Sequence, residues 1–235
     1  MEPPYYYFMP LESHFDRGYG VIGDAYFEAA DELAKIEANE KRLHAHLPIN
    51  YLYRHAVELY LKSMIVMVHS AFEVSTNNPT PKPPRVSLRG KSRRCDKVHT
   101  VGGLWACLNG LMNKHKGALK AASSTDWSEL EQCEPWVKEI DAVDLTGTLQ
   151  KYPISGNEAD RQKASFKPMT EELLAKVLGL GGYVKALVLE NADGSTESFM
   201  LDASPTKNLR ETLVQCVKLL SDAHFGMRCE LGNGR

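Results

Sequence analysis

Apolar residues recur at intervals of three and four over two long stretches in the first third of the chain. The first stretch covers about residues 22–46. Its apolar positions at helical spacing are Tyr26, Ala29, Ala30, Leu33 and Ile36. The second stretch begins at Pro48, which suits a helix start, and runs without Gly or another Pro to about residue 73. Its apolar surface is so broad that we expect a central, mostly buried helix.

The helical pattern stops after the second stretch and resumes at Thr100. Residues 74–98 are rich in Pro, Ser, Asn and basic residues, which predicts a long basic surface loop. Thr100 can cap a third helix, whose apolar positions include Leu104, Trp105, Leu108, Leu111 and Met112. A fourth helical segment begins near Ser124 or Thr125, and we expect Pro135 to kink or divide it.

The last third of the chain is less regular. Residues 148–203 predict an irregular insertion, which includes a short helix in "MTEELLAKVLGL" and a β-hairpin that turns at Asp193-Gly194. A closing helix begins at Ser204, with Pro205 in its first turn. Its apolar face holds Leu209, Leu213, Val217 and Leu220.

Together these elements predict a mainly α fold, a helical bundle of about four to six helices with a small β-hairpin excursion. We expect an extended leader over residues 1–20, one helical domain over 21–225 and a flexible tail over 226–235.

Composition and net charge limit the classes of function that this chain can have. A chain of 235 residues with 43% apolar residues can bury a sizeable core. Its formal net charge of −2 excludes a globally basic protein that coats nucleic acid, so any RNA contact must come from a local patch. One such patch holds Lys82, Arg85, Arg89, Lys91, Arg93, Arg94 and Lys97, with Asp96 as its single acid.

Cysteine spacing and hydropathy indicate the compartment. Five widely spaced cysteines without a CxxC pair argue against a disulfide scaffold and a zinc ribbon, so we expect reduced thiols in a cytoplasmic protein. The N-terminus has no signal-peptide pattern, and no apolar run reaches the roughly eighteen residues that a membrane span needs. We therefore expect a soluble protein without a membrane partner.

Four polar residues lie close together on the second helix. Arg54, Glu58 and Lys62 are spaced i, i+4 and i+8 along one stripe, with His55 beside Glu58. Such a stripe forms modest surface ion pairs if it is exposed. If this helix is as buried as its apolar residues indicate, the charges must instead pair in the core, where His55 and His99 are natural additions.

Arg94 and His99 are separated by four residues in "KSRRCDKVHT", just before the third helix. On one phosphate, such a pair can cleave RNA without a metal, because histidine moves a proton while arginine stabilises the developing negative charge. A histidine at a helix start more often fixes the entry of the loop by hydrogen bonds to the core. Arg93 also lies in range of His99, and roughly one such spacing arises by chance in this composition. The sequence leaves the catalytic and structural roles open.

The signatures of several common enzyme classes are absent from the sequence. It has no GxxxxGK[ST] loop, GxSxG elbow, HExxH pair or GxGxxG loop. His44 and His46 are two residues apart, which does not place them on one helix face, and no nearby ligand completes a tetrahedral set. We expect neither a metal site nor a cofactor.

Three segments resemble the bacterial HEPN-like helical domains. "LPINYLYRHAVELYLKSMI" is followed after the loop by "KVHTVGGLWACLNGLM" and later by "LQKYPIS". In this family a helix with an Arg-His-Ala-x-Glu-Leu-x-Leu-Lys core precedes a helix that opens with His and continues to Leu-Trp, and a Tyr-Pro segment follows. The resemblance covers about residues 45–155.

The resemblance implies a helical bundle, frequently a homodimer, from a bacterial or phage-related defence or toxin system. Catalytic members are metal-independent ribonucleases with an Arg-x4-6-His pair, which falls here on Arg94, or Arg93, and His99. Many members are instead noncatalytic interaction or nucleotide-binding modules that act with a partner protein, and this alternative stays open. The candidate binding residues are Arg54, His55, Glu58, Lys62, Arg89, Arg93 and Lys97.

Overall fold

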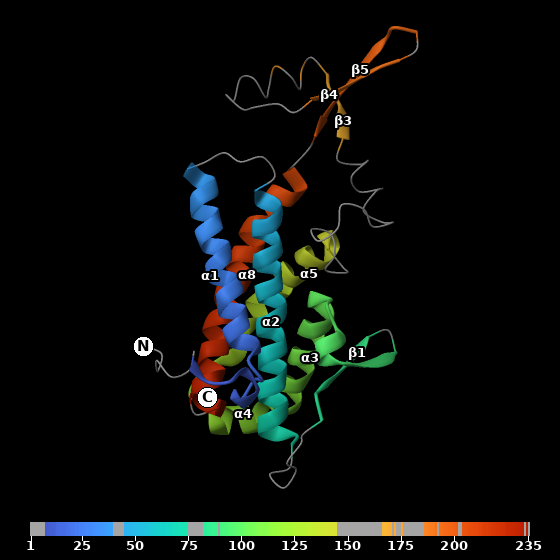
Figure 1. Cartoon of the computed structure of the whole chain (residues 1–235). Helices are drawn as coiled ribbons and strands as arrows, with labels where there is room; N and C mark the ends of the chain where they lie inside the picture. Colours follow the sequence, from blue (N-terminus) through green and yellow to red (C-terminus); the bar gives the residue numbers. More distant parts are fainter. Residues whose placement is uncertain are drawn as a thin grey trace. The chain divides into compact units, whose positions relative to one another are not determined.

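The computed structural model is mainly helical, as the hydrophobic pattern predicts, with two small antiparallel sheets (Figure 1). It describes residues 8–39, 45–74, 82–88, 90–144, 166–170, 172, 175, 186–191, 193–201, 204–232 and 234. The chain forms two compact units, one of Met1–Lys151 with Leu209–Arg235 and one of Tyr152–Asn208. The sequence predicted one domain, and the second unit corresponds closely to the insertion predicted at 148–203.

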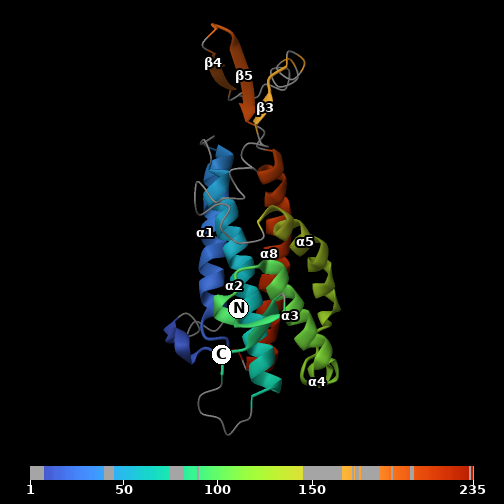
Figure 2. The same cartoon turned by 90° about the vertical axis from the view of Figure 1, so that its right-hand side faces the viewer.

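Helices α1 (Tyr19–Asn39) and α2 (His46–Phe72) run side by side, and α8 (Ser204–Gly232) runs beside them in both views (Figures 1 and 2). The described side chains of α2 from Tyr53 to Val68 are buried except that of His55, which confirms the predicted central helix. Two buried tyrosines of α2 bind carboxylates of α1. Tyr53 donates to Asp31 and Tyr60 donates to Asp24, each over 2.6 Å.

The N-terminal segment departs from the predicted extended leader. A short 3-10 helix, η2 (Leu11–Ser13), precedes buried His14 and Asp16. The Asp16 carboxylate accepts hydrogen bonds from the backbone N–H groups of Gly18 and Gly20, at 2.9 and 2.6 Å. These bonds satisfy donors at the start of α1, which explains why the helix begins before the predicted residue 22.

A hairpin interrupts the long loop that the sequence predicted at 74–98. Strands β1 (Arg85–Leu88) and β2 (Lys91–Arg94) pair antiparallel, with Val86 opposite Arg93. Val86 is buried, and Gly90 in the turn has φ +75°, a conformation that favours glycine. The prediction of one continuous loop is wrong here, because the anchoring Val86 and the turn at Gly90 suffice for a short hairpin.

Three helices follow the hairpin: α3 (Val101–Lys114), α4 (Lys116–Ala122) and α5 (Cys133–Val143). Thr100 precedes α3 as predicted, but its side chain makes no capping hydrogen bond. The predicted fourth segment begins as a 3-10 helix, η4 (Trp127–Gln132), capped by Asp126 instead of Ser124 or Thr125. Glu230 accepts hydrogen bonds from both Ser123 and Ser124, so these serines are held by α8 instead of capping. Pro135 lies in the first turn of α5, where proline is tolerated.

The second unit contains a three-stranded antiparallel sheet with the order β3-β5-β4. Its strands are β3 (Phe166–Pro168), β4 (Ala186–Glu190) and β5 (Thr196–Leu201). Strands β4 and β5 form the predicted hairpin, and Gly194 in its turn has φ +82°. The short helix predicted in "MTEELLAKVLGL" falls largely outside the described residues.

Helix α8 begins at Ser204, as predicted, and its predicted apolar face is buried at Leu209, Leu213, Val217 and Leu220. It continues to Gly232, so the prediction of a flexible tail over 226–235 is wrong. Met227 and Arg228 are buried in this last part, which ties the helix end to the core. No helix in the described part of the chain combines the length and apolar character needed to cross a bilayer.

Candidate functional site

Three charged side chains of α2 form one buried network. Arg54, Glu58 and Lys62 have side chains that are 3%, 2% and 4% exposed. The Glu58 carboxylate accepts hydrogen bonds from Arg54 Nη1 at 2.7 Å and from Lys62 Nζ at 2.8 Å. The i, i+4, i+8 spacing places all three on one stripe. This stripe faces the interior. Of the two interpretations that the sequence offered, the structure confirms the one in which the charges pair in the core.

Asp144, directly after α5, completes the network. Its Oδ2 lies 3.2 Å from Arg54 Nε, and its side chain is 5% exposed. Sequence reasoning missed Asp144. A charge count carried a signal, because two cations on a buried helix against one carboxylate call for a second anion. The spacing alone could not select Asp144 among the acids of this region.

The network keeps Glu58 ionised. Burial by itself raises the pKa of a carboxyl, but the charges and hydrogen bonds of Lys62 and Arg54 outweigh it and lower the pKa of Glu58 to about 2. An ionised carboxylate only accepts hydrogen bonds. Any nitrogen that bonds Glu58 must therefore carry the proton.

His99 connects this buried network to the surface. Its Nδ1 lies 2.9 Å from Glu58 Oε1, while its side chain is 55% exposed. Because Glu58 only accepts, Nδ1 carries the proton and Nε2 of the neutral ring is left as an acceptor. Arg54 also donates from Nη2 to the backbone carbonyl of His99, which fixes the backbone next to the ring. An imidazole oriented in this way can take a proton from a hydroxyl group.

His55 does not join the network through its described contacts. Its ring stacks on Tyr51, with centroids 5.7 Å apart and planes 8° apart. Tyr26 of α1 meets the same ring edge-on, with centroids 4.5 Å apart. These described contacts of His55 are with aromatic rings, and its joining the Glu58 cluster stays a prediction. One step along a helix turns a side chain by about 100°, which carries His55 away from the stripe of Arg54.

Arg94 is held apart from His99 by a different partner. Its Nε and Nη2 donate to the two carboxylate oxygens of Asp96, at 3.0 and 3.1 Å, and its side chain is 56% exposed. Among the described residues, no hydrogen bond or ion pair joins Arg94 to His99. The single-turn 3-10 helix η3 (Cys95–Lys97) lies between them in the chain. The structure thus places both candidates at the surface but gives each its own carboxylate partner, Glu58 for His99 and Asp96 for Arg94.

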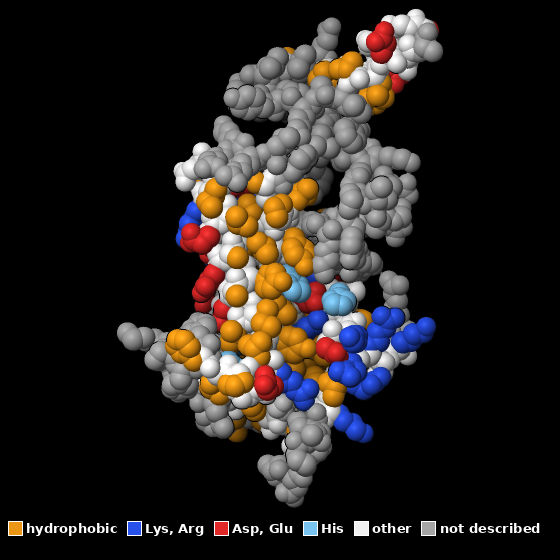
Figure 3. Space-filling model, viewed as in Figure 1, with side chains coloured by type: hydrophobic (Ala, Val, Ile, Leu, Met, Phe, Trp, Pro, Cys, Tyr) orange, Lys and Arg blue, Asp and Glu red, His pale blue; other side chains and the backbone are white. Residues whose placement is uncertain are grey.

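The other described basic candidates, Arg93 and Lys97, lie on or next to the hairpin. Figure 3 shows Lys and Arg side chains gathered where Figure 1 places β1. We call this the basic hairpin surface, and its exposed members are Arg85, Lys91, Arg93, Arg94 and Lys97. Arg89 lies outside the described residues. Such a surface attracts phosphates without reading sequence.

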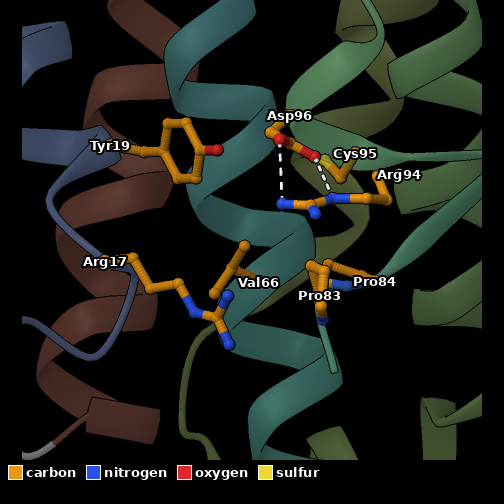
Figure 4. A pocket seen from close by; sticks show the side chains of 8 residues that line it. All are labelled: Arg17, Tyr19, Val66, Pro83, Pro84, Arg94, Cys95 and Asp96. Carbon is orange, nitrogen blue, oxygen red and sulfur yellow. Dashed lines mark hydrogen bonds and ion pairs between the residues drawn. The ribbon is translucent and has the colours of Figure 1, made fainter. Parts of the chain in front are cut away.

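A small pocket lies beside Arg94, and residues of η3 and of the start of α1 both line it (Figure 4). Its lining residues are Arg17, Tyr19, Val66, Pro83, Pro84, Arg94, Cys95 and Asp96. Sequence reasoning missed Arg17 and Tyr19. No sequence signal could have found them, because only the fold brings the N-terminal segment to the end of β2.

The described residues contain no group of three or more His, Cys, Asp or Glu side chains arranged to hold a metal ion. No family model, curated protein or solved structure matches this chain.

Proposed function

We propose that this chain is a HEPN-like protein of a bacterial or phage-related defence or toxin system, and that it cleaves RNA without a metal through His99. The observation that carries the proposal is the pairing of exposed His99 with buried, ionised Glu58. The pairing leaves one ring nitrogen at the surface as a proton acceptor, next to the basic hairpin surface. In this proposal the protein acts in the cytoplasm as a homodimer. The five cysteines, all free in the structure, agree with a reducing compartment.

The proposed reaction is a transesterification within the RNA strand. Nε2 of His99 takes the proton of a ribose 2′-hydroxyl, and the 2′-oxygen attacks the adjacent phosphorus. The bond from phosphorus to the 5′-oxygen of the next nucleotide breaks. This oxygen takes up a proton from water, and His99 returns its own proton to the solvent, which leaves a 2′,3′-cyclic phosphate and a 5′-hydroxyl. DNA has no 2′-hydroxyl and is spared.

An arginine of the hairpin stabilises the negative charge that develops on the phosphate. Arg94 fills this role in the proposal, with Arg93 as its neighbour on β2. Arg94 must exchange Asp96 for the phosphate. This exchange costs little, because an exposed ion pair contributes about 0–1 kcal/mol, whereas a guanidinium binds phosphate through two charge-assisted hydrogen bonds.

The experiment is cleavage of a mixed RNA pool by the purified full chain in EDTA, with the ends of the products identified. We expect products with 2′,3′-cyclic phosphate ends, and loss of cleavage in His99→Gln. His115→Gln is the matched control. His115 directly follows α3, as His99 precedes it, and the His115 ring lies 3.1 Å from a carboxylate oxygen of Glu73, which directly follows α2. Cleavage by His99→Gln at the parent rate, or no cleavage by the parent, contradicts the proposal.

A noncatalytic module acting with a partner protein is the second candidate, and one observation favours it. Glu58 and Arg54 hold both the ring and the backbone carbonyl of His99, which ties the start of α3 to α2. In this reading His99 maintains the fold, and the basic hairpin surface contacts a partner or a nucleotide. A parent that does not cleave RNA, together with a His99→Gln variant of much lower stability, supports this candidate.

A further inference from the structure

The pocket beside Arg94 carries two guanidinium groups that enter it from different parts of the chain. Arg17 extends from the segment before α1 and Arg94 from the end of β2, so the two groups approach from opposite sides (Figure 4). The pocket holds about 110 Å³. Sites for whole small-molecule ligands are typically about 300–1,000 Å³. This pocket therefore fits a single compact group, not a nucleotide.

The charge in the pocket favours an anion. Arg17 and Arg94 contribute two positive charges and Asp96 one negative charge, so the lining is positive overall. Burial raises the pKa of the Cys95 thiol to about 12, which keeps the thiol neutral. Burial also raises the pKa of Tyr19, so its hydroxyl keeps a proton to donate. Val66, Pro83 and Pro84 supply apolar walls, which strengthen the electrostatic interactions beside them.

The backbone at Arg17 is fixed in a conformation that suits glycine better than arginine. Arg17 has φ +62° and is the only described non-glycine residue with a positive φ. Buried Asp16 holds the turn in place, through its bonds to the N–H groups of Gly18 and Gly20 and a 2.6 Å bond from Ser63. A strained residue in a turn this firmly held points to a role for its side chain.

We propose that this pocket binds a phosphate group of RNA, held between Arg17 and Arg94 with the Tyr19 hydroxyl as a further donor. Planar guanidinium groups match the oxygen geometry of a phosphate. Asp96 and His99 are three steps apart along the chain and so at most about 10 Å apart, which lets one short RNA strand reach both the pocket and His99. The pocket holds the phosphate next to the one that is cleaved, so the five donors of Arg94 serve both phosphates, and the pocket sets the register of the strand.

The choice of RNA as ligand rests on the proposed function, so binding is measured apart from cleavage. The probe is a short RNA with 2′-O-methyl groups, which cannot undergo the proposed reaction. Its affinity for the full chain is measured in EDTA for the parent, Arg17→Gln, Asp96→Asn and Arg93→Gln, with circular dichroism as the check of folding. Inorganic phosphate is then added as a competitor to each protein.

The expected results distinguish RNA binding in the pocket from nonspecific attraction of RNA to the basic hairpin surface. Loss of the charge-assisted hydrogen bonds of Arg17 weakens RNA binding about tenfold or more. Asp96→Asn tightens binding, because it removes the one negative charge of the lining and releases Arg94. Arg93→Gln removes the same charge from the neighbouring hairpin position, outside the pocket. Arg93→Gln therefore lowers the RNA affinity less than Arg17→Gln does. Inorganic phosphate still competes with RNA for Arg93→Gln, but it no longer competes for Arg17→Gln.

Three results would overturn the pocket as an RNA phosphate site. They are an Arg17→Gln affinity within about twofold of the parent, equal losses in Arg17→Gln and Arg93→Gln, and weaker binding by Asp96→Asn. Asp96→Asn keeps the proposal testable if Arg17→Gln does not fold. A parent that binds the modified RNA through Arg17 but does not cleave ordinary RNA leaves the pocket standing and removes the proposed catalysis. A parent that cleaves RNA, with an Arg17→Gln variant that binds the modified RNA as the parent does, leaves the proposed catalysis standing and removes the pocket.

Discussion

The carboxylate of Glu58 lies 2.9 Å from Nδ1 of His99, although the Glu58 side chain is 2% exposed and that of His99 is 55% exposed. This hydrogen bond joins the buried charged cluster of α2 to the surface beside the hairpin. Arg54 and Lys62 keep Glu58 ionised, and Glu58 in turn fixes the tautomer of His99. Folding stability and the proposed chemistry therefore depend on the same carboxylate.

Glu58→Gln tests the buried network. We expect a loss of about 3–5 kcal/mol in the free energy of unfolding, because Arg54 and Lys62 stay buried without their shared anion. Urea unfolding measures this loss. Glu134→Gln is the matched control, since Glu134 forms an i,i+4 ion pair with Lys138 on the surface of α5. The control should lose no more than about 1 kcal/mol. Similar losses in both variants would show that the network adds nothing beyond a surface pair.

Acid should destabilise the protein as Glu58 is protonated. Its folded pKa of about 2 lies below the ordinary 4.5, so its contribution is fully present above pH 4.5 and is lost as the pH falls toward 2. The difference corresponds to about 3 kcal/mol. Burial by itself raises the pKa of Asp16, but the ion pair with His224 at 3.5 Å and the hydrogen bonds from Ser63 and Gly20 outweigh it and lower the pKa to about 2.

Urea midpoints at pH 7, 4 and 3 measure this acid effect. The midpoint should drop between pH 4 and 3, and the drop should be smaller in Glu58→Gln, which has lost one of the two groups. An unchanged midpoint over this range would contradict the assigned pKa of Glu58.

Gly20→Ala tests the packing of the N-terminal turn against α8. A Cβ at Gly20 would overlap His224 Nε2 and would lie 2.8 Å from Asp16 Oδ2. We expect a destabilisation of about 1–3 kcal/mol, because these buried groups have little room to move. In Gly110→Ala, the control in α3, the added Cβ meets nothing within 4 Å and should stabilise the helix by about 0.5–1 kcal/mol. Urea unfolding measures both changes. A change of the same sign in the free energy of unfolding of both variants would argue against this packing.

Arg17→Gly should separate stability from RNA binding. Relief of the positive φ outweighs the entropy that glycine adds to the unfolded chain, so we expect a gain of about 0.5–1 kcal/mol. The same variant should bind RNA more weakly, since the pocket loses a guanidinium group. Arg93→Gly, in a strand, should instead lose about 0.5–1 kcal/mol. Thermal unfolding of both variants measures the change, and a destabilised Arg17→Gly would mean that its side chain contributes more to folding than its backbone costs.

Helical periodicity predicted most of the first unit. The face of α8 at Leu209, Leu213, Val217 and Leu220 is buried as its spacing requires, and the broad apolar surface of α2 led correctly to a central helix. Local turn chemistry placed the β4–β5 hairpin at Gly194. These features follow from interactions between residues close in the chain, which a sequence displays directly.

Tertiary structure alone decided the partners of the charged groups. The i, i+4 stripe selected Arg54, Glu58 and Lys62, but Asp144 reaches Arg54 from a segment about ninety residues away. Arg17 and Arg94 line one pocket because folding brings the N-terminal turn to the end of β2. His99, which the spacing paired with Arg94, bonds Glu58 of α2 instead, forty-one residues away. Spacing along the chain determines which side chains share a helix face, whereas the packing of distant segments determines which charges meet.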